Sequence, residues 1–179
     1  MPRMLSGHMQ GRILSMLSKM VRPERILEIG TYTGYSAICL CEGLSDGGIL
    51  HTIDINEELA SMVRRYFREA NLEDKIKYHT GNAVNILPQI NEIFDLVFID
   101  ADKENYSLYF DLVFDKVKKG GYIIADNVLW SGKVTEPEPA MDKDTRALAA
   151  YCRKLQHDKR LENILLPVRD GLMISRKLI

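Results

Sequence analysis

The sequence lacks an excess of charge of either sign, and it lacks any long apolar run. Lys and Arg total 24 and Asp and Glu total 25 of 179 residues, a formal net charge of −1. Because nucleic-acid-binding domains present a basic face or stripe, we expect no nucleic-acid partner. No apolar segment approaches the ~20 residues of a membrane span, and residues 1–5 do not resemble a signal peptide. We therefore expect no membrane partner and a cytoplasmic location.

Cysteine and histidine are also scarce and unpatterned. The three cysteines, at positions 39, 41 and 152, form an odd set without a pairing pattern, which indicates reduced thiols. The four histidines are scattered and lack the spacing of zinc ligands. These features exclude a disulfide scaffold and a zinc domain, and they agree with a cytoplasmic protein.

The length and hydrophobic periodicity predict one α/β domain over residues 1–179. Strands are expected at 25–29, 49–55, 76–79, 94–99 and 122–125, and helices at 5–21, 35–44, 56–70, 83–90, 106–117 and 145–156. Lys116, Lys118 and Lys119 before two glycines predict a helix C-terminus. Residues 128–144, with two prolines and many charges, predict a mobile loop. Two strands, at 161–168 and 172–177, flank an Asp-Gly turn that favours a hairpin.

The alternation of strands and helices predicts a Rossmann-like, mostly parallel seven-stranded sheet with helices on both faces and an antiparallel C-terminal hairpin. In such sheets, ligands bind beyond the carboxyl ends of the strands. Residues that directly follow strands are therefore the candidates for function.

The first strand is followed by Gly30 and Gly34, and it carries Glu28 near its end. Glycine lets the backbone turn sharply and approach a ligand closely. The same spacing also occurs in a strand-to-helix turn without a ligand. A carboxylate on an apolar strand is costly unless something pairs with it, and a cationic ligand such as a sulfonium amino acid would supply that partner.

The second and third strands are also followed by polar residues. Asp54 comes twenty positions after Gly34, where an acid is placed to accept hydrogen bonds from ribose hydroxyls. The alternative is a charge at a helix N-terminus. Residues 81–83 favour an adenine pocket and a helix cap equally.

The fourth strand is followed by Asp100 and the fifth by Asp126 and Asn127. Neighbouring strand ends would bring these hard oxygen donors together, and such donors suit magnesium or calcium. The alternative is the ordinary polarity of loops. Since both motifs lie on neighbouring strand ends, we favour a metal site.

Three segments, 27–36, 98–106 and 121–130, resemble the caffeoyl-CoA and catechol O-methyltransferase family, and residues 166–172 are similar to that family's last hairpin. The resemblance implies a class I methyltransferase that uses S-adenosylmethionine and a divalent cation, usually Mg²⁺ with Ca²⁺ or Mn²⁺ as alternatives. It implies methylation of one of two adjacent hydroxyls on a small aromatic diphenol.

The resemblance also implies roles residue by residue. The metal ligands would be Asp100, Asp126 and Asn127. Lys103, with Asp100, would be catalytic, and Trp130 and Asp170 would lie near the acceptor. The cofactor would be bound by residues of four strand ends: Glu28, Gly30, Tyr32, Ser36, Asp54, Ile55, Ala83, Asp100 and Asp102.

This chemistry explains the residue types. A phenol with a pKa near 10 is mostly protonated at pH 7, and a bound cation stabilises its oxyanion and orients two neighbouring oxygens. Lys103 matches the family's proposed base, a role that requires a lowered pKa. It could instead act only by its charge, or be an exposed lysine at a helix start.

Two departures from the family pattern limit what the resemblance implies. Family members usually carry a longer N-terminal segment that covers the acceptor and builds the dimer, so the expected homodimer rests on family likeness alone. No loop for a coenzyme A portion is recognisable, so a thioester acceptor is not implied and the chain resembles the bacterial branch. The alternatives are a metal-independent methyltransferase acting on another nucleophile and a non-catalytic cofactor-binding domain.

Overall fold

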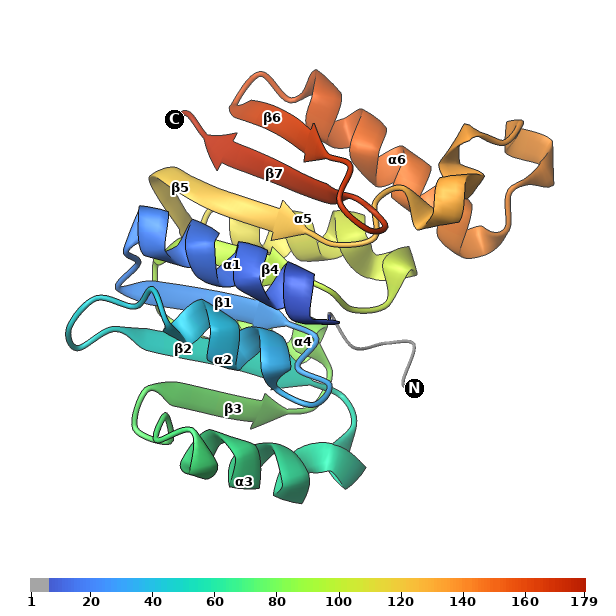
Figure 1. The fold of residues 1–179 in the computed structure, drawn as a ribbon. Coiled ribbons are helices and arrows are strands. Elements are labelled where there is room, and N and C mark those ends of the chain that lie inside the picture. The colour runs from blue at the N-terminus through green and yellow to red at the C-terminus, as the bar shows by residue number, and fades with distance from the viewer. Residues whose placement is uncertain (1–6) are drawn as a thin grey trace.

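The computed structural model describes residues 7–179 and contains one seven-stranded sheet with helices on both faces (Figure 1). The predicted start of the first helix, at residue 5, lies outside the described residues. The elements follow in this order: α1 Gly7–Val21, β1 Arg25–Ile29, α2 Tyr35–Cys41, β2 Ile49–Asp54, η1 Glu57–Leu59, α3 Ala60–Glu69, β3 Ile76–Thr80, α4 Ala83–Ile86, η2 Leu87–Gln89, β4 Phe94–Ile99, η3 Lys103–Asn105, α5 Tyr106–Phe114, β5 Val117–Ala125, η4 Trp130–Thr135, η5 Glu138–Ala140, α6 Lys143–His157, β6 Leu161–Leu166 and β7 Leu172–Lys177.

The strand order is β3-β2-β1-β4-β5-β7-β6. The first five strands are parallel, whereas β7 runs antiparallel to both β5 and β6. The predicted fold is therefore confirmed, including the hairpin at its edge. None of the helices within residues 7–179 combines the length and the apolar character needed to cross a membrane.

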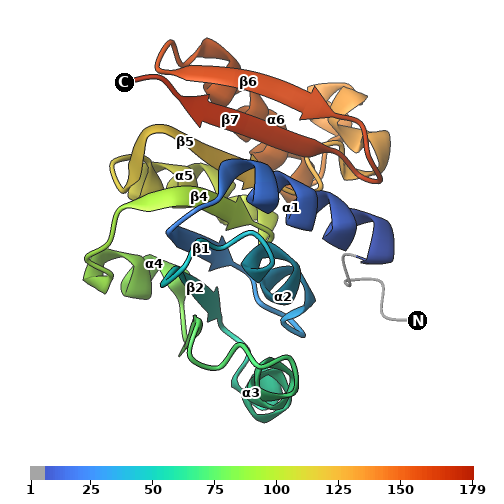
Figure 2. The same ribbon diagram turned by 60° about the vertical axis from the view of Figure 1, so that its left-hand side comes forward.

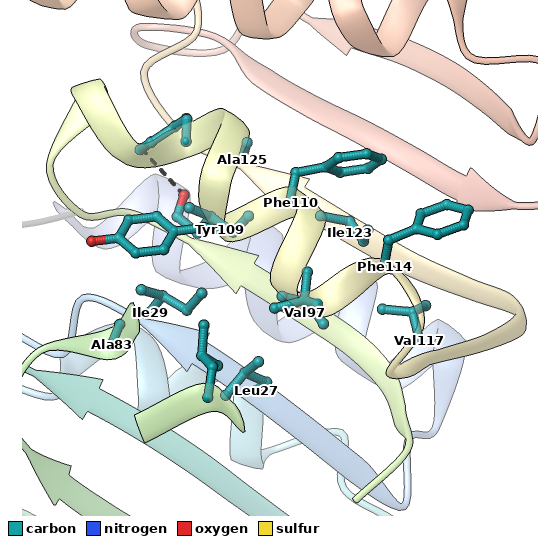
Figure 3. Close-up of a cluster of buried hydrophobic side chains, with 14 of the residues drawn as sticks. Leu27, Ile29, Ala83, Val97, Tyr109, Phe110, Phe114, Val117, Ile123 and Ala125 are labelled. Carbon is teal, nitrogen blue, oxygen red and sulfur yellow. Dashed lines mark hydrogen bonds between the residues drawn. The ribbon is translucent and has the colours of Figure 1, made fainter. Parts of the chain in front are cut away.

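Two apolar layers cover the two faces of the sheet, and Figures 1 and 2 show the helices that supply them. Leu14 of α1, Leu40 of α2 and Phe67 of α3 pack on one face. On the other face α4, α5 and α6 pack, and Figure 3 shows Phe110 and Phe114 of α5 beside side chains of β1, β4 and β5. Coverage on both faces explains why every residue of β4 is buried.

The lysine cluster before Gly120 is not a helix end, so that prediction was wrong. Helix α5 ends at Phe114, and Lys118 lies in β5, where its ammonium pairs with the carboxylate of Asp95 on β4. Gly120 has a φ of 81°, which lets the chain bend within β5. A short local pattern of cations and glycines could not reveal this pairing with a distant strand.

Other boundaries also differ from the sequence prediction. Residues 128–144 form the two short helical turns η4 and η5 and the start of α6, instead of a loop throughout. The expected helix over 83–90 divides at Pro88 into α4 and η2, because proline at the start of η2 does not donate a backbone hydrogen bond. The helix expected to end at residue 44 ends at Cys41, and the strand expected to end at residue 168 ends at Leu166.

Two stacked imidazoles, one buried and one half-buried, join β2 to the edge strand β3. His51 of β2 is 4% exposed, and its Nδ1 lies 3.1 Å from Nε2 of His79 on β3. The rings stack with centroids 5.3 Å apart, and Nε2 of His51 has no hydrogen-bond partner. Burial, followed by the charge of His79, lowers the pKa of His51 from 6.5 to about 4.

We expect acid to destabilise the fold through this pair. The unfolded chain protonates His51 near pH 6.5, but the folded chain protonates it only near pH 4, so the free energy of unfolding falls as pH drops across that interval. Replacing His51→Gln should reduce this loss by roughly 1 to 2 kcal/mol, measured by urea denaturation at pH 7 and pH 4.5. An unchanged pH dependence in the variant would contradict the assignment, and His157→Gln, at an exposed histidine, is the control.

Candidate active site

One row of the sheet aligns residues at or next to the ends of four parallel strands. Ile29 of β1 pairs with Ile53 of β2 and with Ile99 of β4, and Ile99 pairs with Ala125 of β5. The next residue of each chain segment lies just beyond this row, and in β2 it is the last residue of the strand. These four residues are Asp54, Gly30, Asp100 and Asp126.

A cleft of about 950 Å³ opens beyond this row. Its lining comes from the ends of five parallel strands and from the β6–β7 turn. Most predicted site residues line it: Gly30, Tyr32, Ser36, Asp54, Ile55, Ala83, Asp100, Asp102, Lys103, Asp126, Asn127, Trp130 and Asp170. The topology therefore brings together residues that are up to 140 positions apart in sequence.

Gly30 allows the end of β1 to pack against the end of β4. Its φ is 102°, and a Cβ at this position would collide with the carbonyl oxygen of Asp100. Only glycine accommodates both the backbone angle and the close approach. The β1 turn therefore lies directly against the residue that begins the Asp100 segment.

Glu28 is the predicted site residue that does not line the cleft. It is fully buried behind Thr31 and Ser36, and Thr52 Oγ1 donates to its Oε2 at 2.5 Å. Its Oε1 has no hydrogen-bond partner. Burial raises the pKa of Glu28 to about 8, although the Ser36 and Thr52 hydroxyls act in the opposite direction. The carboxyl group is therefore held as an acid with one oxygen available to a further donor.

Asp54 organises the turn after β2. Its Oδ2 accepts the backbone N–H of Tyr32 at 2.6 Å, and its Oδ1 accepts that of Asn56 at 2.8 Å. Asn56 caps the following helical turn through Glu58 N, so Asp54 is not needed as the cap. Asp54 instead joins the glycine turn of β1 to the end of β2.

Residues 81–83 cap a helix and also line the cleft. The Asn82 side chain accepts the N–H of Val84 and caps α4, and Gly81, Asn82 and Ala83 all line the cleft. Their place in an adenine pocket stays a prediction.

Asp100, Asp126 and Asn127 follow the ends of β4 and β5 and line the same cleft. Asp126 is 2% exposed, and its pKa is raised by burial and then by the charge of Asp100. Mutual repulsion of two acids in a shared cleft fits a cation held between them. Within residues 7–179 no three histidine, cysteine or acidic side chains form a metal cluster, so a cation here would rely on Asn127 as its third protein ligand.

Lys103 is a buried cation at this centre and not an exposed lysine. It is 8% exposed, and its Nζ lies 3.2 Å from Asp100 Oδ1 and donates to Tyr106 Oη at 2.6 Å. Its ammonium also lies over the rings of Tyr106 and Trp130, at 4.7 and 5.8 Å from their centroids. Burial raises the pKa of Tyr106, so its hydroxyl keeps its proton and accepts from Lys103.

The remaining predicted residues are fixed by hydrogen bonds within the chain. Asp102 accepts the hydroxyl of Tyr109 and the amide of Asn105, each at 2.5 Å. Asp170 accepts the N–H of Ser131 at 2.5 Å, directly after Trp130. Asp170 therefore supports the segment that carries Trp130 as well as lining the cleft.

A family model described as O-methyltransferase matches residues 1–178. The chain belongs to the O-methyltransferase family. It is 36% identical to a caffeoyl-CoA O-methyltransferase of Eucalyptus globulus over 182 residues, which cover 94% of this chain and 73% of the relative.

Solved structures of other O-methyltransferases share the fold closely. The enzyme from Bacillus cereus, in complex with SAH, has a TM-score of 0.92 and 32% identity over 98% of this chain and 84% of its own. TomG from Streptomyces achromogenes, in complex with SAM, has a TM-score of 0.92 and 28% identity over 100% and 84%. The protein is thus an S-adenosylmethionine-dependent O-methyltransferase.

Sequence reasoning missed several residues of this O-methyltransferase site. Lys103 is hydrogen-bonded to Tyr106, Asp102 to Tyr109 and Glu28 to Thr52. Gln10 of α1 donates a hydrogen bond to Asp126. Gln10 had one visible signal, a polar residue one helical turn before Leu14 on the buried face of an amphipathic helix. The others lie in apolar segments, where their partners depend on the sheet register.

We expect Glu28→Gln to stabilise the enzyme at alkaline pH. The folded chain keeps a proton on Glu28 up to about pH 8, whereas the unfolded chain loses it near 4.5, so the free energy of unfolding falls as pH rises between these values. Glutamine removes this dependence and should add roughly 2 to 4 kcal/mol at pH 8. Urea denaturation at pH 5 and pH 8 measures the difference.

The control for this experiment is Glu58→Gln, which changes an exposed acid in η1. In this control the free energy of unfolding should depend on pH as it does in the wild type. Equal stability of wild type and Glu28→Gln at pH 8 would show that Glu28 is not held as a buried acid.

Proposed function

We propose that the protein transfers a methyl group from S-adenosylmethionine to one of two adjacent hydroxyls of a catechol-like small molecule, with a divalent cation at Asp100, Asp126 and Asn127. The observation that carries the proposal is the meeting of Asp100, Asp126 and Lys103 at two strand ends, beside the glycine turn of β1. Its support is the chemistry of that donor set.

The cofactor half of the cleft fits a sulfonium nucleoside. Gly30, Tyr32 and Ser36 would border its methionine end, Asp54 its ribose and Ala83 its adenine. The unpartnered Oε1 of Glu28 lies behind this half and suits a cationic amino group. Asp102 and Ile55 complete the same wall.

The acceptor half of the cleft is assigned to Trp130, Asn127 and Asp170. A divalent cation bound by oxygen ligands stabilises a phenolate and favours two adjacent oxygens on the acceptor. The indole of Trp130 offers a flat apolar contact for an aromatic ring. Lys103 lines the same cleft beside Asp100, and in this proposal it would reach an acceptor hydroxyl.

In this proposal the neutral amine form of Lys103 receives the hydroxyl proton and becomes the ammonium ion. Its Nζ is held by Asp100 and Tyr106, so the group is oriented before substrate arrives. Asp100 balances the positive charge while the ammonium form is present. Because the hydroxyl of Tyr106 also donates to the carbonyl oxygen of Asp126, the two catalytic strand ends are linked.

We expect activity on a vicinal diphenol to require a divalent cation and Asp126. Excess EDTA should abolish turnover and added Mg²⁺ should restore it, while Asp126→Ala should lower kcat by roughly 10²-fold or more. A radiolabelled methyl-transfer assay measures both effects. Asp111→Ala is the matched control, because Asp111 forms an exposed ion pair with Lys154 on α6.

Full activity in excess EDTA would overturn the metal role and favour a metal-independent methyltransferase. Retained activity of Asp126→Ala in the presence of Mg²⁺ would remove Asp126 from the ligand set.

We expect Lys103→Met and Lys103→Arg to be similarly inactive. Each loses a group that can accept a proton, since guanidinium stays charged, and kcat should fall by roughly 10² to 10⁴-fold. Steady-state kinetics over a range of pH measure the change, with Lys154→Met as the control. If Lys103→Arg keeps activity within about tenfold of wild type, the lysine acts through its charge and not as a base.

A further inference from the structure

Gln10 connects α1 to the centre of the site. It lies near the N-terminal end of α1, and Figure 1 shows this end of the helix on the side of the sheet to which the strand arrowheads point. The side chain is 2% exposed, although glutamine is seldom fully buried. Its Nε2 donates to Asp126 Oδ2 at 2.5 Å, and its Oε1 accepts from Arg169 Nη1 at 2.9 Å.

The chemistry of its two partners fixes the orientation of the Gln10 amide. A carboxylate only accepts hydrogen bonds, so the NH₂ group must face Asp126. A guanidinium only donates them, so the amide oxygen must face Arg169. Glutamine offers both an uncharged donor and an acceptor, which explains a polar residue on this buried helix face.

Gln10 completes the hydrogen bonds that hold the Asp126 carboxylate. Oδ1 accepts the N–H of Asn127 at 2.7 Å, and Oδ2 accepts Gln10. Two donors on the two oxygens fix the rotation of the carboxylate plane. Because Gln10 is neutral, it orients the carboxylate without supplying a compensating charge, in contrast to Lys103 beside Asp100.

Arg169 extends the connection to the β6–β7 turn. The same turn holds the segment after Asn127, since Gly171 O and Asp170 O accept the N–H groups of Val128 and Leu129. The turn also carries Asp170, which lines the cleft. The path from the turn through Gln10 to Asp126 is therefore continuous.

We propose that Gln10 is a positioning residue that fixes the Asp126 carboxylate for cation binding, and that Arg169 acts on Asp126 through Gln10. This inference rests on the proposed metal-dependent function. Groups that orient metal ligands commonly contribute about 10- to 100-fold to metal affinity.

The first experiment measures Mn²⁺ binding by calorimetry, apart from activity. Gln10→Met keeps the length and apolar stem but removes both hydrogen bonds, and Mn²⁺ should bind roughly 10- to 100-fold more weakly. Ser18→Ala is the matched control, because Ser18 is buried on the same helix and donates to Leu40 O at 2.6 Å, away from the cleft. It should lower stability without changing Mn²⁺ affinity, and both variants should bind SAH like wild type.

The second experiment is a double-mutant cycle with Arg169→Met. The single Arg169→Met variant should weaken Mn²⁺ binding, but the same change should have little effect in the Gln10→Met background, because the connection is already broken. The Arg169→Met variant also tests the proposal if Gln10→Met does not fold, since it leaves the Gln10–Asp126 hydrogen bond available. Additive effects of the two changes would overturn the path through Gln10.

The outcomes separate this inference from the proposed function. If the wild type binds Mn²⁺ and Gln10→Met binds it with the same affinity, the positioning role is overturned and the metal role stands. No Mn²⁺ binding by the wild type, alone or with SAH and a catechol, overturns both. Weaker binding in Gln10→Met with wild-type affinity in Ser18→Ala supports the inference.

Discussion

The parallel register of β2, β1, β4 and β5 brings the chemistry of this protein to one level. Backbone hydrogen bonds continue past the paired row, since Gly30 N donates to Ile53 O, Asp100 N to Ile29 O and Asp126 N to Ile99 O, at 2.9 to 3.0 Å. The first residue after each strand is therefore held nearly as firmly as the strand itself. A shift of one residue would turn the side chains of a strand to the opposite face of the sheet and misplace the whole set.

Because that register is rigid, the enzyme can hold charged groups at high density. Asp100, Asp126 and Lys103 share a small, largely buried volume, with Glu28 as a buried acid nearby. Each group has partners from other elements, such as Tyr106 for Lys103 and Thr52 for Glu28. Burial without these partners would cost several kcal/mol for each charge, on the order of the whole stability of a domain. The site thus depends on hydrogen bonds that a helix or strand alone would not supply.

Acid–base behaviour links stability to the same architecture in two opposite directions. Burial lowers the pKa of His51 and raises the pKa of Glu28. His51 therefore destabilises the folded state in acid, and Glu28 destabilises it in alkali. Both groups lie on parallel strands within the apolar layers. A donor that reaches Oε1 of Glu28 would lower its pKa, so under the proposed function the protonation of Glu28 would depend on whether the cofactor is bound.

The order of strands and helices, the hairpin and the residues that follow each strand could be predicted from the sequence, because hydrophobic periodicity and turn residues are local properties. It also indicated the family, through segments that carry glycine turns and acidic strand ends. The single-domain assignment of residues 1–179 and the expected homodimer stay predictions.

The contacts between side chains could not be predicted in this way. The lysines before Gly120 belong to a strand because Lys118 meets Asp95, Glu28 lies behind the cleft instead of in its wall, and Gln10 reaches Asp126 across 116 positions. Such contacts depend on sheet register and helix packing, which no local pattern encodes. The candidate residues could therefore be chosen by residue type and position, whereas the orientation of each side chain depends on long-range packing.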